Sequence, residues 1–350
     1  MTIDGKNEKQ FMNLYCNCNI NNITITNTKY GKYNSSGVIA MQNASNLKLE
    51  NSTFTNNQGK IKGCVITNRG VCEINNCTFI NNTSQKTGGA IWSTGEYGGQ
   101  LIINNTTFKE NLANQKLNHE RTSIVYLVSY GNNIIENNTF TDNTGRCIHS
   151  YLNTNSTIRN NTFNHNNLTF DDVIRGGVID NYESDLTVEN NTFNQDYSIG
   201  ELRGGIIYHE IGYLKFNNNN VNNNHTQEEP TTTTTCSKGG VIFNRNATIE
   251  MKNNQFNNHL TANNARGGVI YNNAGNITLE KNIYNNQVNG EKIKGTTIFN
   301  DVNGIIHTKN DEYKTVLHGT SDKSDETPYV YNSDIQNEEG NGTRGQIIYD

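Results

Sequence analysis

A basic residue stands directly before a glycine in six segments of the second half of the chain. A regular row of guanidinium and ammonium groups can bind an anionic polymer, for instance a sulfated or sialylated glycan. If the segments stack at strand spacing, neighbouring charges lie about 5 Å apart and repel by about 1 kcal/mol even in water. A ligand could offset this repulsion, or nearby acids could: Asp171, Asp172, Glu201 and Glu210. The six basic residues, called the basic stripe below, are Arg175, Arg203, Lys238, Arg266, Lys294 and Arg344.

The carboxylates of the chain form only one cluster that could support acid–base chemistry. Enzymes that cleave glycosidic bonds need paired carboxylates, and Asp171, Asp172 and Asp180 lie close to Arg175 in sequence. Because a basic residue lies among them, this group is better explained by charge compensation than by catalysis. The histidines that could assist them occupy different positions of the repeat described below: His149, His165 and His209. We therefore expect a protein that is not an enzyme.

The cysteines give little indication of a metal centre. There are seven, and the closest pair, Cys16 and Cys18, has no matching second pair of the kind that zinc sites use. Cys72 occupies an apolar, inward position of the repeat, which is typical of a packed thiol. We expect no metal, no cofactor, and one or two disulfides at most.

An internal repeat positions these residues. An aromatic residue, called the mark of the unit below, closes each unit, and Val221 is the one aliphatic replacement. The spacing between marks ranges from 23 residues (Phe140 to Phe163) to 35 residues (Val221 to Phe256), so a constant core carries variable insertions. The marks are Tyr30, Phe54, Phe79, Phe108, Phe140, Phe163, Phe193, Val221, Phe256, Tyr284 and Tyr313.

Each unit predicts two short strands. Seven and five residues before the mark lie two apolar residues, for example Leu47 and Leu49, and this period of two is typical of a strand. Strict alternation places an asparagine three residues before the mark on the same inward face. Stacked amides would hydrogen-bond to one another and so offset the cost of burying them. This predicted asparagine ladder contains Asn51, Asn76, Asn105, Asn137, Asn160, Asn190, Asn218 and Asn253.

A second strand begins just after the glycine turn and carries an isoleucine column. Its members are Ile39, Ile66, Ile91, Val125, Ile148, Ile179, Ile207, Ile242, Ile270, Ile298 and Ile348. Units of two or three short strands without a helix predict an all-β fold, a parallel β-helix of about eleven coils. A leucine-rich repeat is the alternative, but it requires leucine-rich spacing and a more regular length.

The insertions fall mainly at one corner of the expected coil, at 112–120, 167–174, 197–202, 225–237 and 314–343. Loops on one edge of a solenoid commonly bind ligands, and otherwise they are tolerated, solvated excursions. We expect residues 1–350 to form a single β-helix domain. Partial coils at both ends and the long polar insertion at 314–343 suggest a segment of a longer protein.

Two motifs resemble a known family. "GGAI" at 88–91 and the Phe-x-x-Asn pairs that begin at Phe54, Phe79, Phe108, Phe140 and Phe163 resemble the repeats of polymorphic outer membrane proteins (Pmp) and of adhesin-like proteins. The resemblance extends over nearly the whole chain. It implies a right-handed parallel β-helix that acts as a surface adhesin. The family provides no set of catalytic residues that could be assigned to positions of this chain.

Composition narrows the function further. The formal net charge of -5 gives no general signature of nucleic-acid binding. No stretch is apolar enough to span a membrane, and the N-terminus lacks the apolar core of a signal peptide. We expect a cell-surface or extracellular protein whose partners are extracellular glycans or host-cell surface proteins. One alternative is a structural stalk, and another is a β-helical polysaccharide lyase or glycoside hydrolase. Ice binding by the Thr column near Thr53 is a remote third alternative.

N-glycosylation motifs occur both in the repeat and in the insertions. The repeat motifs coincide with the predicted ladder, and buried asparagines cannot carry glycans. The better acceptors, if the chain is secreted, are the asparagines expected in loops: Asn34, Asn167, Asn224 and Asn341.

Overall fold

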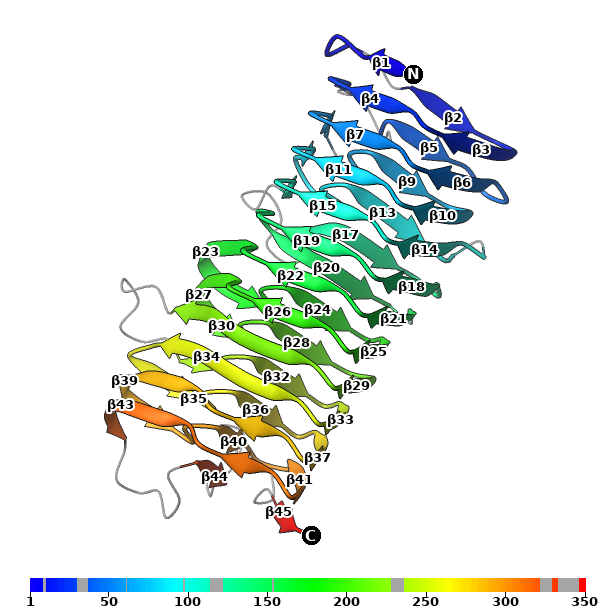
Figure 1. Ribbon diagram of the computed structural model, residues 1–350. Helices are drawn as coiled ribbons and strands as arrows, with labels where there is room; N and C mark the ends of the chain where they lie inside the picture. The colour runs from blue at the N-terminus through cyan, green and yellow to red at the C-terminus, as the bar shows by residue number, and fades with distance from the viewer. Residues whose placement is uncertain are drawn as a thin grey trace. The chain divides into compact units, whose positions relative to one another are not determined.

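The computed structural model describes residues 1–8, 11–29, 37–60, 62–96, 98–113, 122–152, 154–227, 236–321, 329–332 and 346–350. These residues form short strands and no helix, and the strands pair in parallel between successive coils (Figure 1). The expected all-β parallel β-helix is confirmed.

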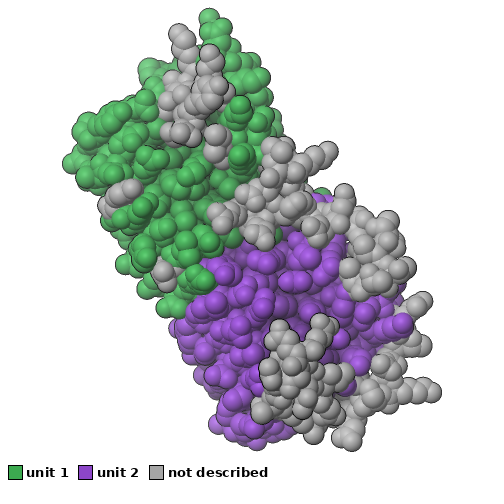
Figure 2. Space-filling model, turned by 180° about the vertical axis from the view of Figure 1, so that it is seen from behind, with its two compact units in different colours: residues 1–167, 183–186 green, residues 168–182, 187–350 purple. Residues whose placement is uncertain are grey.

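The chain divides into two compact units (Figure 2). Unit 1 contains residues 1–167 and 183–186, and unit 2 contains residues 168–182 and 187–350. Both are built from the same coil, in which a first strand follows the glycine turn, a second carries the apolar pair, and a third carries the closing aromatic. The expectation of one continuous domain remains a prediction.

Unit 1 has three parallel sheets and a short fourth one. Its first strands are β2 (Met12–Leu14), β5 (Ile39–Met41), β9 (Ile66–Asn68), β13 (Ile91–Thr94), β17 (Ser123–Val128) and β20 (Arg146–Tyr151). Its second strands are β3 (Asn17–Asn21), β6 (Asn46–Glu50), β10 (Val71–Asn75), β14 (Gln100–Asn104), β18 (Asn132–Glu136) and β21 (Asn155–Arg159). Its third strands are β1 (Thr2–Asp4), β4 (Thr24–Thr26), β7 (Thr53–Thr55), β11 (Thr78–Ile80), β15 (Thr107–Lys109), β19 (Thr139–Thr141) and β22 (Thr162–Asn164). The short sheet contains β8 (Gln58–Gly59), β12 (Thr83–Ser84) and β16 (Leu112–Ala113).

Unit 2 repeats this coil and adds a return strand to it. Its first strands are β24 (Ile179–Tyr182), β28 (Ile207–Glu210), β32 (Ile242–Arg245), β36 (Ile270–Asn273), β40 (Ile298–Asn300) and β44 (Val330–Asn332). Its second strands are β29 (Tyr213–Asn217), β33 (Thr248–Lys252), β37 (Asn276–Glu280), β41 (Ile305–Lys309) and β45 (Gln346–Tyr349), while β25 (Asp185–Glu189) has residues in both units. Its third strands are β26 (Thr192–Asn194), β30 (Asn220–Gln227), β34 (Gln255–Thr261), β38 (Ile283–Tyr284) and β42 (Glu312–Tyr313). The return strands are β23 (Asn167–Arg175), β27 (Tyr197–Arg203), β31 (Ser237–Lys238), β35 (Asn264–Arg266), β39 (Gln287–Lys294) and β43 (Val316–Ser321).

The corner between the second and third strands corrects the predicted ladder. The eight predicted asparagines are exposed and have left-handed backbones, with φ between 49° and 58°. Asparagine tolerates this conformation better than most residues. Because a left-handed residue interrupts strand alternation, its side chain points outward and the next residue points inward. The prediction failed by one position: the buried residues are Ser52, Cys77, Thr106, Asn138, Asn161, Asn191, Asn219 and Asn254.

Buried asparagine ladders do exist, at positions other than the predicted ones. In unit 1 the asparagines of the first four Phe-x-x-Asn motifs donate to the next coil, as in Asn111 Nδ2 to Asn143 Oδ1 at 3.1 Å. In unit 2 the buried corner asparagines do the same, as in Asn254 Nδ2 to Asn282 Oδ1 at 2.8 Å. The predicted residues still form hydrogen bonds with one another on the outside; Asn76 Nδ2 lies 2.6 Å from Asn51 Oδ1.

The aromatic marks form columns inside each unit. In unit 1 the rings of Phe54, Phe79, Phe108, Phe140 and Phe163 stack with centroids 4.6–5.2 Å apart. In unit 2 Val221 interrupts the column, and Phe216 of the second strand supplies a ring there. Its centroid lies 6.1 Å from Phe193 and 6.2 Å from Phe256.

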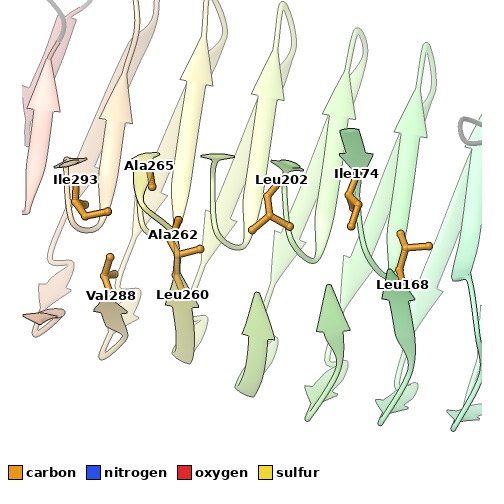
Figure 3. Close-up of a cluster of buried hydrophobic side chains, with 8 residues drawn as sticks. All are labelled: Leu168, Ile174, Leu202, Leu260, Ala262, Ala265, Val288 and Ile293. Carbon is orange, nitrogen blue, oxygen red and sulfur yellow. The ribbon is translucent and has the colours of Figure 1, made fainter. Parts of the chain in front are cut away.

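The insertions of unit 2 are ordered strands in the part of the chain that the structure describes. Segments 167–174 and 197–202 belong to β23 and β27, which contradicts their interpretation as solvated excursions. Their apolar residues lie on facing rows and enclose a second small core (Figure 3). Most of 112–120 and 314–343, and residues 228–235, lie outside the described residues. The second core contains Leu168, Ile174, Leu202, Leu260, Ala262, Ala265, Val288 and Ile293.

The isoleucine column is confirmed in each unit except at its last member. Ile179, Ile207, Ile242, Ile270 and Ile298 lie on successive first strands of unit 2. The residue paired with Ile298 is Val330, whereas Ile348 lies on a second strand opposite His307. The motif at 344–350 therefore does not open a coil in the predicted register.

Candidate functional site

The basic stripe of unit 2 lies at the ends of the return strands. Arg175, Arg203, Lys238, Arg266 and Lys294 end β23, β27, β31, β35 and β39 respectively. The last four lie opposite one another in consecutive pairs, Arg203 with Lys238, Lys238 with Arg266, and Arg266 with Lys294. Arg175 lies beside Arg203, because Gly176 N donates to Arg203 O at 3.1 Å. The structure therefore brings all five into one row at strand spacing, about 4.8 Å per step.

The glycine after each basic residue is required by the backbone. Gly239, which follows Lys238, has φ +68°, and a Cβ there would lie only 2.1 Å from the carbonyl oxygen of Ile242. Any side chain would displace the turn that joins the return strand to the first strand. The turn thus fixes where each basic side chain leaves the backbone.

The sequence alignment that assigned Arg344 to this row is not supported by the structure. The residue itself lies outside the described residues. It was aligned with the row through Ile348, which the structure places on a second strand and not on a first strand. The alignment is wrong because the insertion before it contains Val330, the true rung of the column.

A column of aromatic rings lies beneath the stripe. Its rings are stacked with centroids 5.0–5.4 Å apart on the first strands of unit 2. Four of the basic groups lie over a ring of the next coil, at 5.3–5.5 Å from its centroid. Such cation–π contacts are favourable by about 0.5–2 kcal/mol each. The pairs are Arg175 with Tyr208, Lys238 with Tyr271, Arg266 with Phe299, and Lys294 with Tyr331.

The rings therefore supply part of the offset that was expected from acids. Among the predicted acids, Glu201 lies 3.8 Å from Arg203, while Glu210 pairs with Arg245, which is outside the stripe. The side chains of Asp171 and Asp172 lie outside the described part of the structure. Sequence reasoning missed the rings, although a signal was present: in four coils of unit 2 an aromatic residue directly follows the column isoleucine, at Tyr208, Phe243, Tyr271 and Phe299.

The stripe remains electrostatically crowded. Burial is the main cause of the lowered pKa of Lys238; the guanidinium groups of Arg266 and Arg203 also lower it, while Cys236 and Asp301 raise it. The Nε of Arg203 is buried and has no hydrogen-bond partner among the described residues. An added anion would relieve the repulsion between the cations.

Among the residues considered for catalysis, His149, Asp180 and His209 lie on first strands, whereas His165 follows a third strand. Asp180 is buried. His209 is also buried and bonds to Asn181 at 2.9 Å. In unit 1, His149 is buried and stacks on Tyr126, whereas His165 is exposed.

A recess of about 200 Å³ on the second strands of unit 2 also contains carboxylates. The hydroxyl of Tyr213 donates to Glu250 at 2.8 Å and is the main cause of the lowered pKa of that carboxyl. Lys252 forms an ion pair with Glu280 at 2.8 Å. A carboxyl with a lowered pKa is poorly suited to act as a general acid.

The cysteines are mostly packed within the fold. Cys64, Cys72 and Cys77 are buried free thiols, and burial raises the pKa of Cys64 to about 12 and that of Cys77 to about 11. Cys16 and Cys18 are free and more accessible. Over the described residues, no group of three or more His, Cys, Asp or Glu side chains is placed to hold a metal ion.

The predicted glycan acceptors have different outcomes. Asn167 is exposed, whereas Asn34 and Asn341 lie outside the described residues. Asn224 is fully buried and donates to Asn258 at 2.8 Å, so it was wrongly proposed as a loop acceptor. Conversely, the corner asparagines that were excluded as buried are exposed, and six of them begin N-x-T motifs: Asn51, Asn76, Asn105, Asn137, Asn160 and Asn190.

Comparison with known proteins supports the fold. Residues 112–256 match the family model described as "Right handed beta helix region". No curated protein and no solved structure matches the chain. Together with the parallel strands, the match identifies a right-handed parallel β-helix. In the part of the chain that the structure describes, no helix is long and apolar enough to cross a membrane.

Proposed function

We propose that this chain is a surface-exposed or secreted, adhesin-like protein that binds anionic glycans without cleaving them. The basic stripe is the main support for this proposal, because one cation per coil lies in register along unit 2. The ligand belongs to a host cell or a neighbouring cell, and the chain resembles Pmp-like adhesins in its "GGAI" and Phe-x-x-Asn motifs. Host-cell surface proteins that carry such glycans are included among the partners.

The carboxylates support a binding role over an enzymatic one. Glu250 and Glu280 are engaged with Tyr213 and Lys252 on the second strands. The stripe lies on the return strands, away from these residues in the coil. A polysaccharide lyase or glycoside hydrolase is the weakest alternative, and release of new reducing ends or unsaturated products from an acidic polysaccharide would favour it.

A glycan-array screen of the purified chain at low and near-physiological salt tests the proposal. Binding to anionic glycans that decreases with salt is expected, because screening weakens exposed charge pairs. The Arg203→Gln/Arg266→Gln variant should lose most of the signal. A matched control is Lys281→Gln/Lys309→Gln, which removes the same charge from exposed sites of unit 2 and should bind normally. An empty array at both salt concentrations would contradict the proposal.

A structural stalk is the second candidate, and a specific observation favours it. The stripe cations are half-buried and lie on aromatic rings, so packing alone could account for their presence. In that case the Arg203→Gln/Arg266→Gln variant would lose stability, and no glycan would bind to the unaltered protein.

A further inference from the structure

We infer that the basic stripe selects a linear polysaccharide that carries one negative charge on every sugar and lies along the stack of coils. This inference rests on the proposed function and specifies its ligand. The residues that carry it are Arg175, Arg203, Lys238, Arg266 and Lys294, all in unit 2.

The ring column sets the period of the charges. The centroids of Phe243 and Tyr271 are 5.2 Å apart, and those of Tyr271 and Phe299 are 5.4 Å apart. Lys238 and Arg266 lie over successive rings at nearly equal distances, 5.3 Å and 5.5 Å. Lys294 continues the series over Tyr331 at 5.4 Å. The cationic groups therefore repeat at about the strand spacing, near 5 Å.

The rings also restrain the cationic groups. Tyr208, Phe243, Tyr271 and Phe299 are at most 3% exposed, so they cannot move away from the side chains above them. A long basic side chain that is already held loses less conformational freedom when a ligand binds.

This period distinguishes among polyanions. An extended pyranose chain advances per sugar by a length close to the strand spacing, roughly 5 Å. A homopolymer of uronic acids therefore carries about one carboxylate for each step of the stripe, so its charge density matches that of the cations. A polymer with a carboxylate on every second sugar supplies only one negative charge for every two cations. A nucleic-acid strand has a shorter charge spacing, about 3.4 Å, and falls out of register within a few steps.

The test compares oligomers of polymannuronate with oligomers of hyaluronan. Both carry carboxylates, on every sugar in the first and on every second sugar in the second. Affinities are measured by titration calorimetry with the full chain at one fixed salt concentration. Mannuronate affinity should rise with length up to about five sugars, because five cations form the row, and then level off. A hyaluronan oligomer with the same number of charges should bind about tenfold more weakly.

Variants separate the stripe from a general effect of charge or of misfolding. Lys238→Gln should weaken mannuronate binding about tenfold, while Arg266→Lys, which keeps the charge, should bind nearly as the unaltered chain. Lys309→Gln is the matched control. Equal affinities for the two polymers at equal charge number would overturn the inference but leave anionic glycan binding intact. If neither polymer binds and the glycan array is also empty, the proposed function itself is overturned.

Discussion

At each corner of the coil, the backbone conformation of one residue decides which side chain enters the core. Asn105 has φ +49° and is exposed, while the next residue, Thr106, is buried. At the following corner Glu110 has φ +54° and Asn111 is buried. The left-handed residue need not be asparagine, but the buried one must satisfy backbone groups of neighbouring coils. The two corner positions therefore differ greatly in their contribution to stability.

Replacing a buried ladder asparagine should be costly. The amide of Asn111 donates to Phe79 O at 2.9 Å, and its oxygen accepts from Asn82 N at 3.0 Å. Asn111→Ala leaves several buried groups unsatisfied and should lower the free energy of unfolding by about 3 kcal/mol or more. Denaturant unfolding measures this change. The matched control is Asn105→Gly, which suits the positive φ and should change stability by less than about 0.5 kcal/mol. Equal losses in the two variants would contradict this assignment.

Glycosylation should follow exposure and not the loop pattern. If the chain is expressed through a secretory pathway, folded product should carry glycans at Asn167 or at corner asparagines such as Asn137, which are exposed. Asn224 should remain unmodified, because it is fully buried within a ladder. Peptide mass spectrometry after enzymatic glycan release identifies the occupied sites. Folded protein with a glycan on Asn224 would contradict the assigned burial.

His225 should make unit 2 sensitive to mild acid. Burial lowers the pKa of His225, and the stacked His259, 4.9 Å away between centroids, lowers it further. The unfolded chain, with a histidine pKa of about 6.5, then binds the proton more tightly than the folded chain. The stabilisation that comes from keeping His225 neutral is fully present above about pH 6.5, and it is lost as the pH falls toward the lowered pKa of His225. The melting temperature should decrease between pH 8 and pH 5.5, and less so in His225→Gln. Identical pH profiles would exclude this role.

Among the elements, the return strands of unit 2 differ most from expectation. Leu202 of β27 and Leu260 of β34 are buried in a core that is separate from the ring and isoleucine columns. This second core fixes the strands that end in the basic stripe. The segments that sequence reasoning treated as variable loops therefore position the candidate site.

Truncating this second core should destabilise unit 2. Leu202→Ala removes a fully buried side chain and should lower the free energy of unfolding by about 2–5 kcal/mol. Ile199→Ala, a half-buried residue of the same strand, is the control and should cost clearly less. Urea unfolding of both variants provides the comparison. A negligible effect of Leu202→Ala would show that the segment is a loop without a core.

The sequence was sufficient for the repeat but not for its corners. The isoleucine and phenylalanine columns follow from spacing alone, because a side chain repeated in every unit must stack. The asparagine ladder was predicted one residue too early, because an alternating strand pattern does not reveal that residues such as Asn51 have a positive φ. The spacing also did not reveal that the ring of Phe216, on another strand, takes the place of the aromatic ring that Val221 lacks. Insertions such as 197–202 were misjudged because their apolar residues pack with distant segments and not with their own coil.

On the scale of the whole molecule, the charge distribution matters more than the net charge. The chain has a formal net charge of -5, yet five cations lie along one edge of unit 2. A local basic row on an acidic protein attracts polyanions only at short range, within about one Debye length, 8–10 Å at physiological salt. Binding should therefore depend on this row and not on general attraction to the surface.

The salt dependence of glycan binding tests this central claim most directly. The affinity of the full chain for mannuronate oligomers would be measured at several salt concentrations, with and without the substitutions Lys238→Gln and Arg266→Gln. Each lost ion pair reduces the slope of log affinity against log salt, so the double variant should show a slope smaller by about one or more. The Lys281→Gln/Lys309→Gln control should keep the original slope. An unchanged slope in the stripe variant, or no binding by the unaltered chain, would contradict the account.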